Sequence, residues 1–359
     1  SAPATAPIPQ ATCPIRVTPR SDDNLANIQA AIDRAASGDC GEVVLSPGSY
    51  EISGPIQLRS GLRLSGQRHK RTFSAIRPGP TFQGRALLQT NFAPETKERK
   101  QNEFYIENLR LDAAPACPTR KNCSRAKVDV GLWLENTPYP TIRDSEFSRF
   151  PAGGAAIRGA GVLYLKLMDC RLLGNFGWGV DLALEYAPRK LGATRPNTYY
   201  AVSVGTIQRN YFAGRRGIRL TPGYLVTIRD NQFEGGLSMI HAYEQTSSVL
   251  VIENNYFEVS ATPQDVPGRG TIAIKGTGRV VGNLMTGPPK GKEGQYPGPA
   301  IEVLASASMT VEDNTVRRFD PGVRINGVPD PDRAIREHGN LIAPKAHVVK
   351  PCDFVPQST

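Results

Sequence analysis

A line of chemically capable side chains recurs at the same place in successive short apolar strands. Each member lies between two apolar residues, as in Val180-Asp181-Leu182 and Ile240-His241-Ala242. Neighbours along a strand point to opposite faces, so inward apolar residues require the residue between them to point outward. We call this set the outer stripe and expect it to face solvent; it runs Trp133, Arg158, Asp181, Arg219, His241 with Tyr243, Lys275, Glu302 and Arg324.

The middle of the outer stripe suits β-elimination on a uronic acid. That reaction needs a cation to neutralise the sugar carboxylate, a base to remove the C5 proton and an acid to assist the leaving oxygen. We assign neutralisation to Arg219 or Lys275 and the base to His241, because an exposed imidazole titrates at about pH 6.5. Tyr243 is the candidate acid. A C5 epimerase shares the first half of this reaction, so the same residues also fit that activity.

The rest of the outer stripe is predicted to bind substrate, together with two loop carboxylates. These residues are Asp181, Arg158, Trp133, Glu302, Arg324, Glu185 and Glu244. Glycoside hydrolysis uses two carboxyl groups about 5–9.5 Å apart. Asp181 and Glu302 are four coils apart, roughly 19 Å at the strand spacing, and cannot form such a pair. A hydrolase would therefore need a loop carboxylate such as Glu185 or Glu244. A carbohydrate-binding or tailspike-like protein without catalysis is the other alternative.

These strands alternate with a recurring phrase, for example Ile228-Arg229-Asp230-Asn231-Gln232-Phe233. Its fourth position recurs in steps of 21 to 40 residues, at Leu109, Ser145, Cys170, Asn210, Asn231, Asn255, Asn283, Asn314 and Asn340. Such a period with variable insertions is typical of a solenoid of short strands. Stacked asparagines at one corner would form an amide ladder, since a buried unpaired amide costs about 1–3 kcal/mol.

The N-terminal region carries a resemblance to a known superfamily. Asp22-Asp23-Asn24 precedes apolar residues at helical spacing, and the helix predicted over about 22–37 ends before Gly38. Gly41-Glu42-Val43-Val44-Leu45 and Leu62-Arg63-Leu64-Ser65-Gly66 follow. This order resembles the entry of pectate-lyase-like right-handed parallel β-helix proteins. The resemblance implies an all-β solenoid whose N-terminal amphipathic helix caps the open first coil.

That superfamily includes lyases, glycosidases, epimerases and tailspikes, so the resemblance selects a fold and no single reaction. The aspartate clusters that bind calcium in pectate lyases are absent, and no cysteine pair has zinc-site spacing. We therefore expect neither a metal nor another cofactor. The 359 residues are divided into an extended arm over 1–20, one β-helix domain over 21–343 and a C-terminal strap over 344–359. Long loops are expected at about 67–104, 112–129 and 184–200.

The net charge of +10 is concentrated in one part of the chain. Between Arg59 and Lys127 there are 15 basic and 5 acidic residues, and the remaining 28 of each kind cancel. Such a concentration indicates a polyanionic partner. No aromatic-and-basic nucleic-acid motif accompanies it, so we expect an acidic polysaccharide or oligosaccharide and no nucleic acid. A solvated basic face is the alternative.

The six cysteines indicate an oxidising compartment, so we expect a secreted or periplasmic protein. Cys13 and Cys40 flank the predicted helix and are positioned to pin it, while Cys117 and Cys123 bracket a short loop. Cys170 occupies a corner position, which favours a buried small residue over a reactive thiol. Cys352 is left over. No apolar run approaches the roughly 18 residues of a membrane span. We expect the protein to be a monomer.

Overall fold

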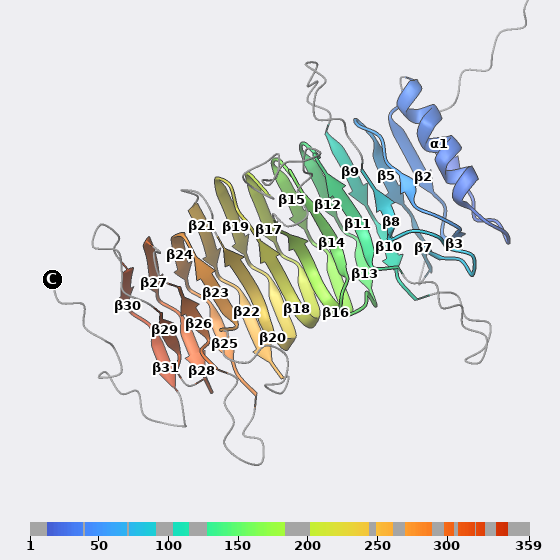
Figure 1. Cartoon of the computed structure of the whole chain (residues 1–359). Helices are drawn as coiled ribbons and strands as arrows, with labels where there is room; N and C mark the ends of the chain where they lie inside the picture. Colours follow the sequence, from blue (N-terminus) through green and yellow to red (C-terminus); the bar gives the residue numbers. More distant parts are fainter. Residues whose placement is uncertain are drawn as a thin grey trace, which may run out of the picture.

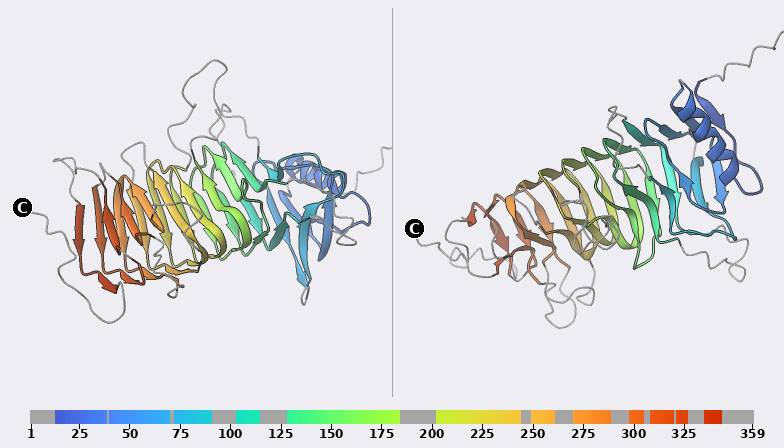
Figure 2. Two further views of the ribbon diagram at one scale, coloured as in Figure 1. Left: turned by 60° about the horizontal axis from the view of Figure 1, so that its bottom comes forward. Right: turned by 45° about the horizontal axis from the view of Figure 1, so that its top comes forward.

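A computed structural model of the chain describes residues 13–38, 40–69, 72–90, 103–114, 128–183, 202–243, 249–260, 270–288, 298–304, 308–319, 321–326 and 335–343. In these ranges the chain is mostly β, with one helix, and winds into a stack of coils running from the N-terminal helix to β31 (Figure 1). Two large parallel sheets form its walls (Figure 2).

The first wall, sheet A, takes one strand from each coil, and all its pairings are parallel. Its strands in spatial order are β1 (Ile15–Val17), β2 (Glu42–Leu45), β5 (Arg63–Gly66), β9 (Phe104–Glu107), β12 (Pro140–Arg143), β15 (Leu165–Met168), β17 (Gly205–Gln208), β19 (Leu225–Arg229), β21 (Val249–Glu253), β24 (Thr277–Val281), β27 (Ser308–Glu312) and β30 (Ile335–His338). Spatial order follows chain order because each coil lies on the one before it.

The second wall, sheet B, contains two parallel ladders that merge in the middle coils. The first ladder follows the asparagine corner: β3 (Gly48–Ile52), β7 (Thr72–Pro78), β10 (Leu109–Asp112), β13 (Glu146–Ser148), β16 (Arg171–Leu182), β18 (Tyr211–Leu220), β20 (Gln232–Tyr243), β22 (Tyr256–Val259), β25 (Leu284–Thr286), β28 (Thr315–Arg317) and β31 (Leu341–Ala343). The second ladder carries the outer stripe: β4 (Ile56–Gln57), β8 (Ala86–Gln89), β11 (Val130–Glu135), β14 (Ala155–Ala160), then β16, β18 and β20 again, β23 (Ile272–Lys275), β26 (Ile301–Val303) and β29 (Val323–Ile325). β6 (Arg68–His69) pairs with β7 in antiparallel fashion.

The predicted asparagine ladder is confirmed at the corner between the sheets. From Asn210 to Asn340, each side-chain amide donates to the Oδ1 of the next asparagine at 2.9–3.0 Å. The backbone N–H of each asparagine donates to that same oxygen. Cys170 and Ser145 continue the line without the amide: the Cys170 N–H donates to Asn210 Oδ1 at 2.9 Å. The repeat therefore fixes the register of successive coils.

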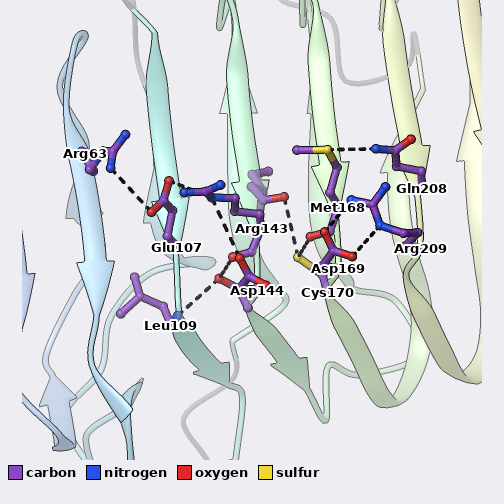
Figure 3. Close-up of polar contacts among 12 residues, drawn as sticks. Arg63, Glu107, Leu109, Arg143, Asp144, Met168, Asp169, Cys170, Gln208 and Arg209 are labelled. Atoms are coloured by element: carbon purple, nitrogen blue, oxygen red, sulfur yellow. Dashed lines mark hydrogen bonds and ion pairs between the residues drawn. The ribbon is translucent and has the colours of Figure 1, made fainter.

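The residue before each corner position turns the chain through the left-handed region. Asp230 and Asn254 both have φ of 55°, and Gly282 has φ of 65°. Asn, Asp and Gly tolerate this conformation best, because other side chains clash with the neighbouring carbonyl. Arg209, with φ of 53°, is an exception, and its guanidinium forms two hydrogen bonds of 2.8 Å with Asp169 on the preceding coil. Figure 3 shows this pair beside Cys170.

Inward residues of both sheets fill the solenoid with one continuous core. Phe212, Phe233 and Phe257 stack along it with ring centroids 4.7 Å apart, which matches the spacing of neighbouring strands. The outer-stripe strands contribute the inward residues that flank each stripe position, such as Ile218 and Leu220. The core thereby fixes which side chains of the second ladder point away from it.

Helix α1 (Leu25–Ser37) lies at the N-terminal end of the stack and buries one face, which carries Ile28, Ala31, Ile32 and Ala35. Asn24 precedes it and Gly38 follows it, as predicted. A disulfide between Cys13 and Cys40 joins the segments on either side of the helix, which confirms the predicted pinning. Cys170 is a buried free thiol, also as predicted. Cys117, Cys123 and Cys352 lie outside the described residues.

Two parts of the predicted division of the chain are wrong. The expected arm over 1–20 contains β1, which pairs with β2 through Ile15 and Val17. The expected loop over 67–104 contains β6, β7 and β8, whose buried residues include Ile76 and Leu88. These strands are short and lie among charged residues, so their alternation was too brief to stand out. The predicted loops over 112–129 and 184–200 and the strap over 344–359 fall largely outside the described residues.

Candidate functional site

The register of the outer stripe is confirmed along the second ladder. Trp133, Arg158, Asp181, Arg219, His241, Glu302 and Arg324 occupy equivalent positions in successive coils. The coil between His241 and Glu302 places Ala273 in this line. Lys275 lies two residues further along β23, opposite Tyr243, and is exposed. Lys275 therefore continues the stripe from Tyr243, and Ala273 continues it from His241.

Four residues of the stripe are buried, which contradicts the expectation that it faces solvent. Arg158 is 4%, Asp181 0%, His241 5% and Glu302 1% exposed. These side chains point away from the apolar core, yet other groups cover them. Arg219 remains 24% exposed at its side chain, and Trp133 and Arg324 are half-buried. Any ligand at this face would therefore reach the stripe mainly through Arg219 and its exposed neighbours.

The centre of the stripe is a buried carboxylate held by two guanidinium groups. Arg219 donates through Nε and Nη2 to the two oxygens of Asp181 at 2.6 and 2.8 Å. Arg158 donates through Nε and Nη2 to Asp181 Oδ2 at 3.2 and 3.1 Å, and its Nη2 also reaches the Gly153 carbonyl at 3.1 Å. Two guanidinium groups from the coils on either side therefore flank this one carboxylate. Such charge-assisted pairs hold the guanidinium groups in fixed orientations.

Trp178 lies against this group and was not predicted. Its ring packs at 5.7 Å from the Arg219 guanidinium and 5.6 Å from that of Arg216, and at 5.4 Å, edge-on, from the His241 ring. A side chain at Gly177 would place its Cβ 2.1 Å from the Gly154 carbonyl oxygen, so glycine permits the close approach of these coils. Strict alternation along β16 predicts that Trp178 points into the core. The pairing of β16 with β18, however, shifts register between Asn175 and Trp178.

Arg216 adds a second cation beside Trp178. Burial lowers the pKa of its guanidinium, and the neighbouring charges of Arg215 and Arg219 lower it further. Its Nε is buried without a hydrogen-bond partner in the part of the chain that the structure describes. Arg216 lies three residues before Arg219 on β18, opposite Trp178 of β16. The face around Trp178 is consequently rich in positive charge.

His241 is the only outer-stripe residue with a side chain suited to accepting a proton near neutral pH. Its Nε2 lies 3.3 Å from the Gly270 carbonyl oxygen. A carbonyl oxygen only accepts, so this bond requires the proton on Nε2 and leaves the lone pair of a neutral ring on Nδ1. The Gly270 N–H in turn donates to Glu302 Oε2 at 3.0 Å, and Arg324 Nη1 lies 3.9 Å from Glu302 Oε1. The backbone at Gly270 thus links His241 to Glu302.

The structure leaves other predicted site residues undescribed. Glu185, Glu244 and the side chain of Tyr243 lie outside what the structure describes, while the backbone of Tyr243 in β20 pairs with Lys275. The described ranges hold no group of three or more His, Cys, Asp or Glu side chains arranged to bind a metal ion. None of their helices is long and apolar enough to cross a membrane.

Comparison with known proteins supports the fold. No protein-family model matches the chain, and no curated protein matches it in sequence. PfbA, a surface adhesin of Streptococcus pneumoniae, superposes with a TM-score of 0.53 and 16% identity, covering 91% of this chain and 88% of that one. The A-module of the mannuronan C-5 epimerase AlgE6 of Azotobacter vinelandii gives a TM-score of 0.41 and 15% identity, covering 90% and 96%. At such identity the likeness concerns fold alone, and the resemblance to right-handed parallel β-helix proteins is confirmed.

Proposed function

We propose that this chain acts on an acidic polysaccharide at the outer face of sheet B, and that it cleaves the polymer by β-elimination. The observation that carries the proposal is the meeting of a buried histidine, a tryptophan and three guanidinium groups on neighbouring coils. Positive charge suits a sugar carboxylate, and a proton-accepting imidazole beside it suits abstraction of the adjacent C5 proton. The reaction breaks the C4–O bond, forms a C4=C5 double bond and returns a proton to the leaving oxygen.

In this proposal His241 is the base and Tyr243 the acid that protonates the leaving oxygen. The neutralising cation changes relative to the sequence-based assignment. Arg219 already gives two N–H groups to Asp181, so its main role is to support the positive face. Arg216, beside Trp178, and Lys275, exposed opposite Tyr243, are better placed to meet a carboxylate from solvent. Asp181 and Arg158 then act as positioning residues for Arg219.

A carbohydrate-binding protein without catalysis is the second candidate. The burial of Asp181 and His241 favours it, because a base at 5% exposure reaches a polymer only if the groups that cover it give way. PfbA, whose fold this chain shares, is described as an adhesin. A hydrolase is less well supported, since Asp181 and Glu302 are separated by four strand spacings, about 19 Å.

We also propose that α1 caps the open first coil and that the protein works outside the cytoplasm. The helix covers inward residues of the first strands through its own buried face, including Ile28 and Ile32, and an uncovered sheet end would recruit other strands. The Cys13–Cys40 disulfide fits an oxidising compartment.

The proposal is tested by incubating the protein with acidic and neutral polysaccharides and following reducing ends together with the ultraviolet absorbance of an unsaturated product. We expect both signals to rise on a uronate polymer and to fall at least 100-fold, on the order expected for losing a general base, in His241→Gln. His338→Gln is the matched control, because that exposed histidine lies on sheet A beside Glu312. Reducing ends without absorbance would contradict β-elimination. Equal activity of His241→Gln and wild type would contradict the assignment of the base.

A further inference from the structure

A second cluster of positive charge lies on sheet B, on coils closer to the N-terminus. Asp112, fully buried, sits at its centre. Arg149 donates to both oxygens of Asp112, with Nε 2.8 Å from Oδ1. The Ala114 N–H donates to the same Oδ1 at 3.1 Å. Arg77 and Arg110 approach Asp112 Oδ2 only to 4.0 and 3.8 Å, which is too long for a hydrogen bond.

These residues project from the outer face of three adjacent strands, β7, β10 and β13, which lie side by side (Figure 1). Ile76, Leu111 and Phe147 point into the core, so the next residue of each strand points outward. Asp112 is in register with Ser148 of β13. Arg149 follows at a corner where φ is 67°. We call Arg77, Arg110, Arg149, Asp112 and Ser148 the Asp112 cluster.

Polar atoms without partners are concentrated in the Asp112 cluster. Among the described residues, four buried side-chain nitrogen or oxygen atoms have no hydrogen-bond partner, and three of them are Arg77 Nε, Arg110 Nε and Ser148 Oγ. Arg110 Nε does lie 3.1 Å from Glu146 Oε1, close enough for an ion pair, but its N–H does not point at that oxygen. Unpaired buried donors are uncommon in native proteins, because each forfeits a hydrogen bond that water would have supplied.

The balance of charge around Asp112 also indicates a surface that attracts anions. Glu146 is shared by Arg110 and Arg171, and Glu51 of β3 is in register with Arg77, so four guanidinium groups lie among three carboxylates and leave an excess of one positive charge. The arginine side chains of the cluster keep part of their surface in solvent, from 25% for Arg77 to 51% for Arg149. Asp112 therefore fixes Arg149 through hydrogen bonds and does not neutralise all three arginines of the cluster.

We propose that the Asp112 cluster is a binding subsite for the carboxylate or sulfate groups of an anionic polysaccharide. Arg149 is fixed by its hydrogen bonds to Asp112 and supplies positive charge, while Arg77 and Arg110, which make no hydrogen bond to that carboxylate, can donate to such groups. The local excess of charge attracts a polyanion before contact. The choice of a polysaccharide as the ligand rests on the proposed function. The inference that the site binds an anionic polymer rests on the charges and hydrogen bonds of the Asp112 cluster alone. The subsite would hold the polymer on the coils whose next strands, β11 and β14, carry Trp133 and Arg158 of the outer stripe, N-terminal to the coils of Asp181 and His241.

The test is affinity electrophoresis of the full chain through gels containing polygalacturonate, dextran sulfate or neutral dextran. We expect retention in the two anionic gels, weakening with added salt, and none in dextran. Arg149→Gln and Arg110→Gln should each raise the apparent Kd by about two- to fivefold at low ionic strength. Arg110→Gln leaves the Arg149–Asp112 pair intact, so its effect does not depend on the stability of that pair. Circular dichroism would verify that each variant is folded.

Arg209→Gln is the matched control. Arg209 also occupies a positive-φ corner, also makes a paired contact with a carboxylate on a neighbouring coil, and is 52% exposed against 51% for Arg149. Its partner Asp169 is half-exposed, and the pair is neutral. Equal retention of all three variants and the wild type would overturn the proposal. Stronger retention by single-stranded DNA than by either polysaccharide, lost in the same variants, would overturn the polysaccharide class.

The outcome is separable from that of the proposed function. Retention that depends on Arg149 and Arg110, in a protein that cleaves no polymer, would support this subsite and contradict β-elimination. If the protein cleaves a uronate polymer, and wild type, Arg149→Gln and Arg110→Gln bind that polymer equally, the result would support β-elimination and contradict this subsite. If only dextran sulfate is retained, sulfate groups are the ligand chemistry; retention by polygalacturonate identifies carboxylates.

Discussion

Replacing Asn255 by alanine tests the principle on which the solenoid is built. Asn255 is 1% exposed, and its side chain takes part in four hydrogen bonds. Its Oδ1 accepts from the backbone N–H and the amide of Asn231, both at 3.0 Å. Its amide donates to the Ile228 carbonyl at 2.9 Å and to Asn283 Oδ1 at 3.0 Å. Alanine removes all four and leaves the Asn231 N–H without its acceptor in a buried corner.

A typical buried hydrogen bond contributes about 0.5–1.5 kcal/mol, and stranding a buried donor costs about 1–3 kcal/mol. We therefore expect Asn255→Ala to lower the free energy of unfolding by about 2–4 kcal/mol. Urea unfolding followed by circular dichroism measures this quantity. Gln232→Ala is the control from a neighbouring corner phrase, because Gln232 is exposed and, among the described residues, its side chain hydrogen-bonds only to Glu234. If the two variants unfold at the same urea concentration, the amide ladder is not what stabilises the corners.

Three further predictions concern particular side chains. Replacing Cys13 and Cys40 together by serine should lower the free energy of unfolding by about 3 kcal/mol, because the disulfide closes a loop of 27 residues; unchanged urea unfolding would contradict this. Burial raises the pKa of the Cys170 thiol to about 12, so peptide mapping after alkylation should find Cys170 unmodified in the folded protein and modified in urea. The hydrogen bond from Arg279 lowers the pKa of Glu312, so this carboxylate stabilises the fold above its unfolded pKa and loses that effect as pH falls through the lowered folded pKa. Titration by NMR should show the Glu312 pKa rise in Arg279→Gln, and an unchanged pKa would refute the pairing.

The corners and the stripe register could be predicted because each rests on a repeated local signal. Asn231 and Asn255 recur in the same phrase, and Arg219 precedes its corner residue by the same twelve positions as Arg158. A constant spacing within a coil becomes a constant place on the sheet, whatever the length of the loop between coils. Lys275 follows Tyr243 and not His241, because β23 continues by two residues past Ala273.

Burial of the stripe could not be read from the same pattern. The alternation of apolar and polar residues predicts on which face of the sheet a side chain lies. It does not predict whether other side chains cover that side chain. Asp181 is buried because arginines from the coils on both sides cover it. Trp178 packs against one of these arginines, Arg219, next to a register shift that alternation does not predict. The Asp112 cluster was missed for a related reason, since its charges come from three coils whose strands are three to seven residues long. The concentration of basic residues was visible, but its arrangement around one carboxylate was not.

The most direct test of the central claim is the mass of the oligosaccharides released from a uronate polymer. Elimination adds no water, so every cleavage by the proposed mechanism leaves a new non-reducing end one water lighter than a hydrolytic end. We predict unsaturated products of this mass with the wild-type protein and none with His241→Gln. Products that carry the full mass of water at each cleaved bond would contradict β-elimination, and intact polymer that remains bound to the protein would identify it as a binding protein.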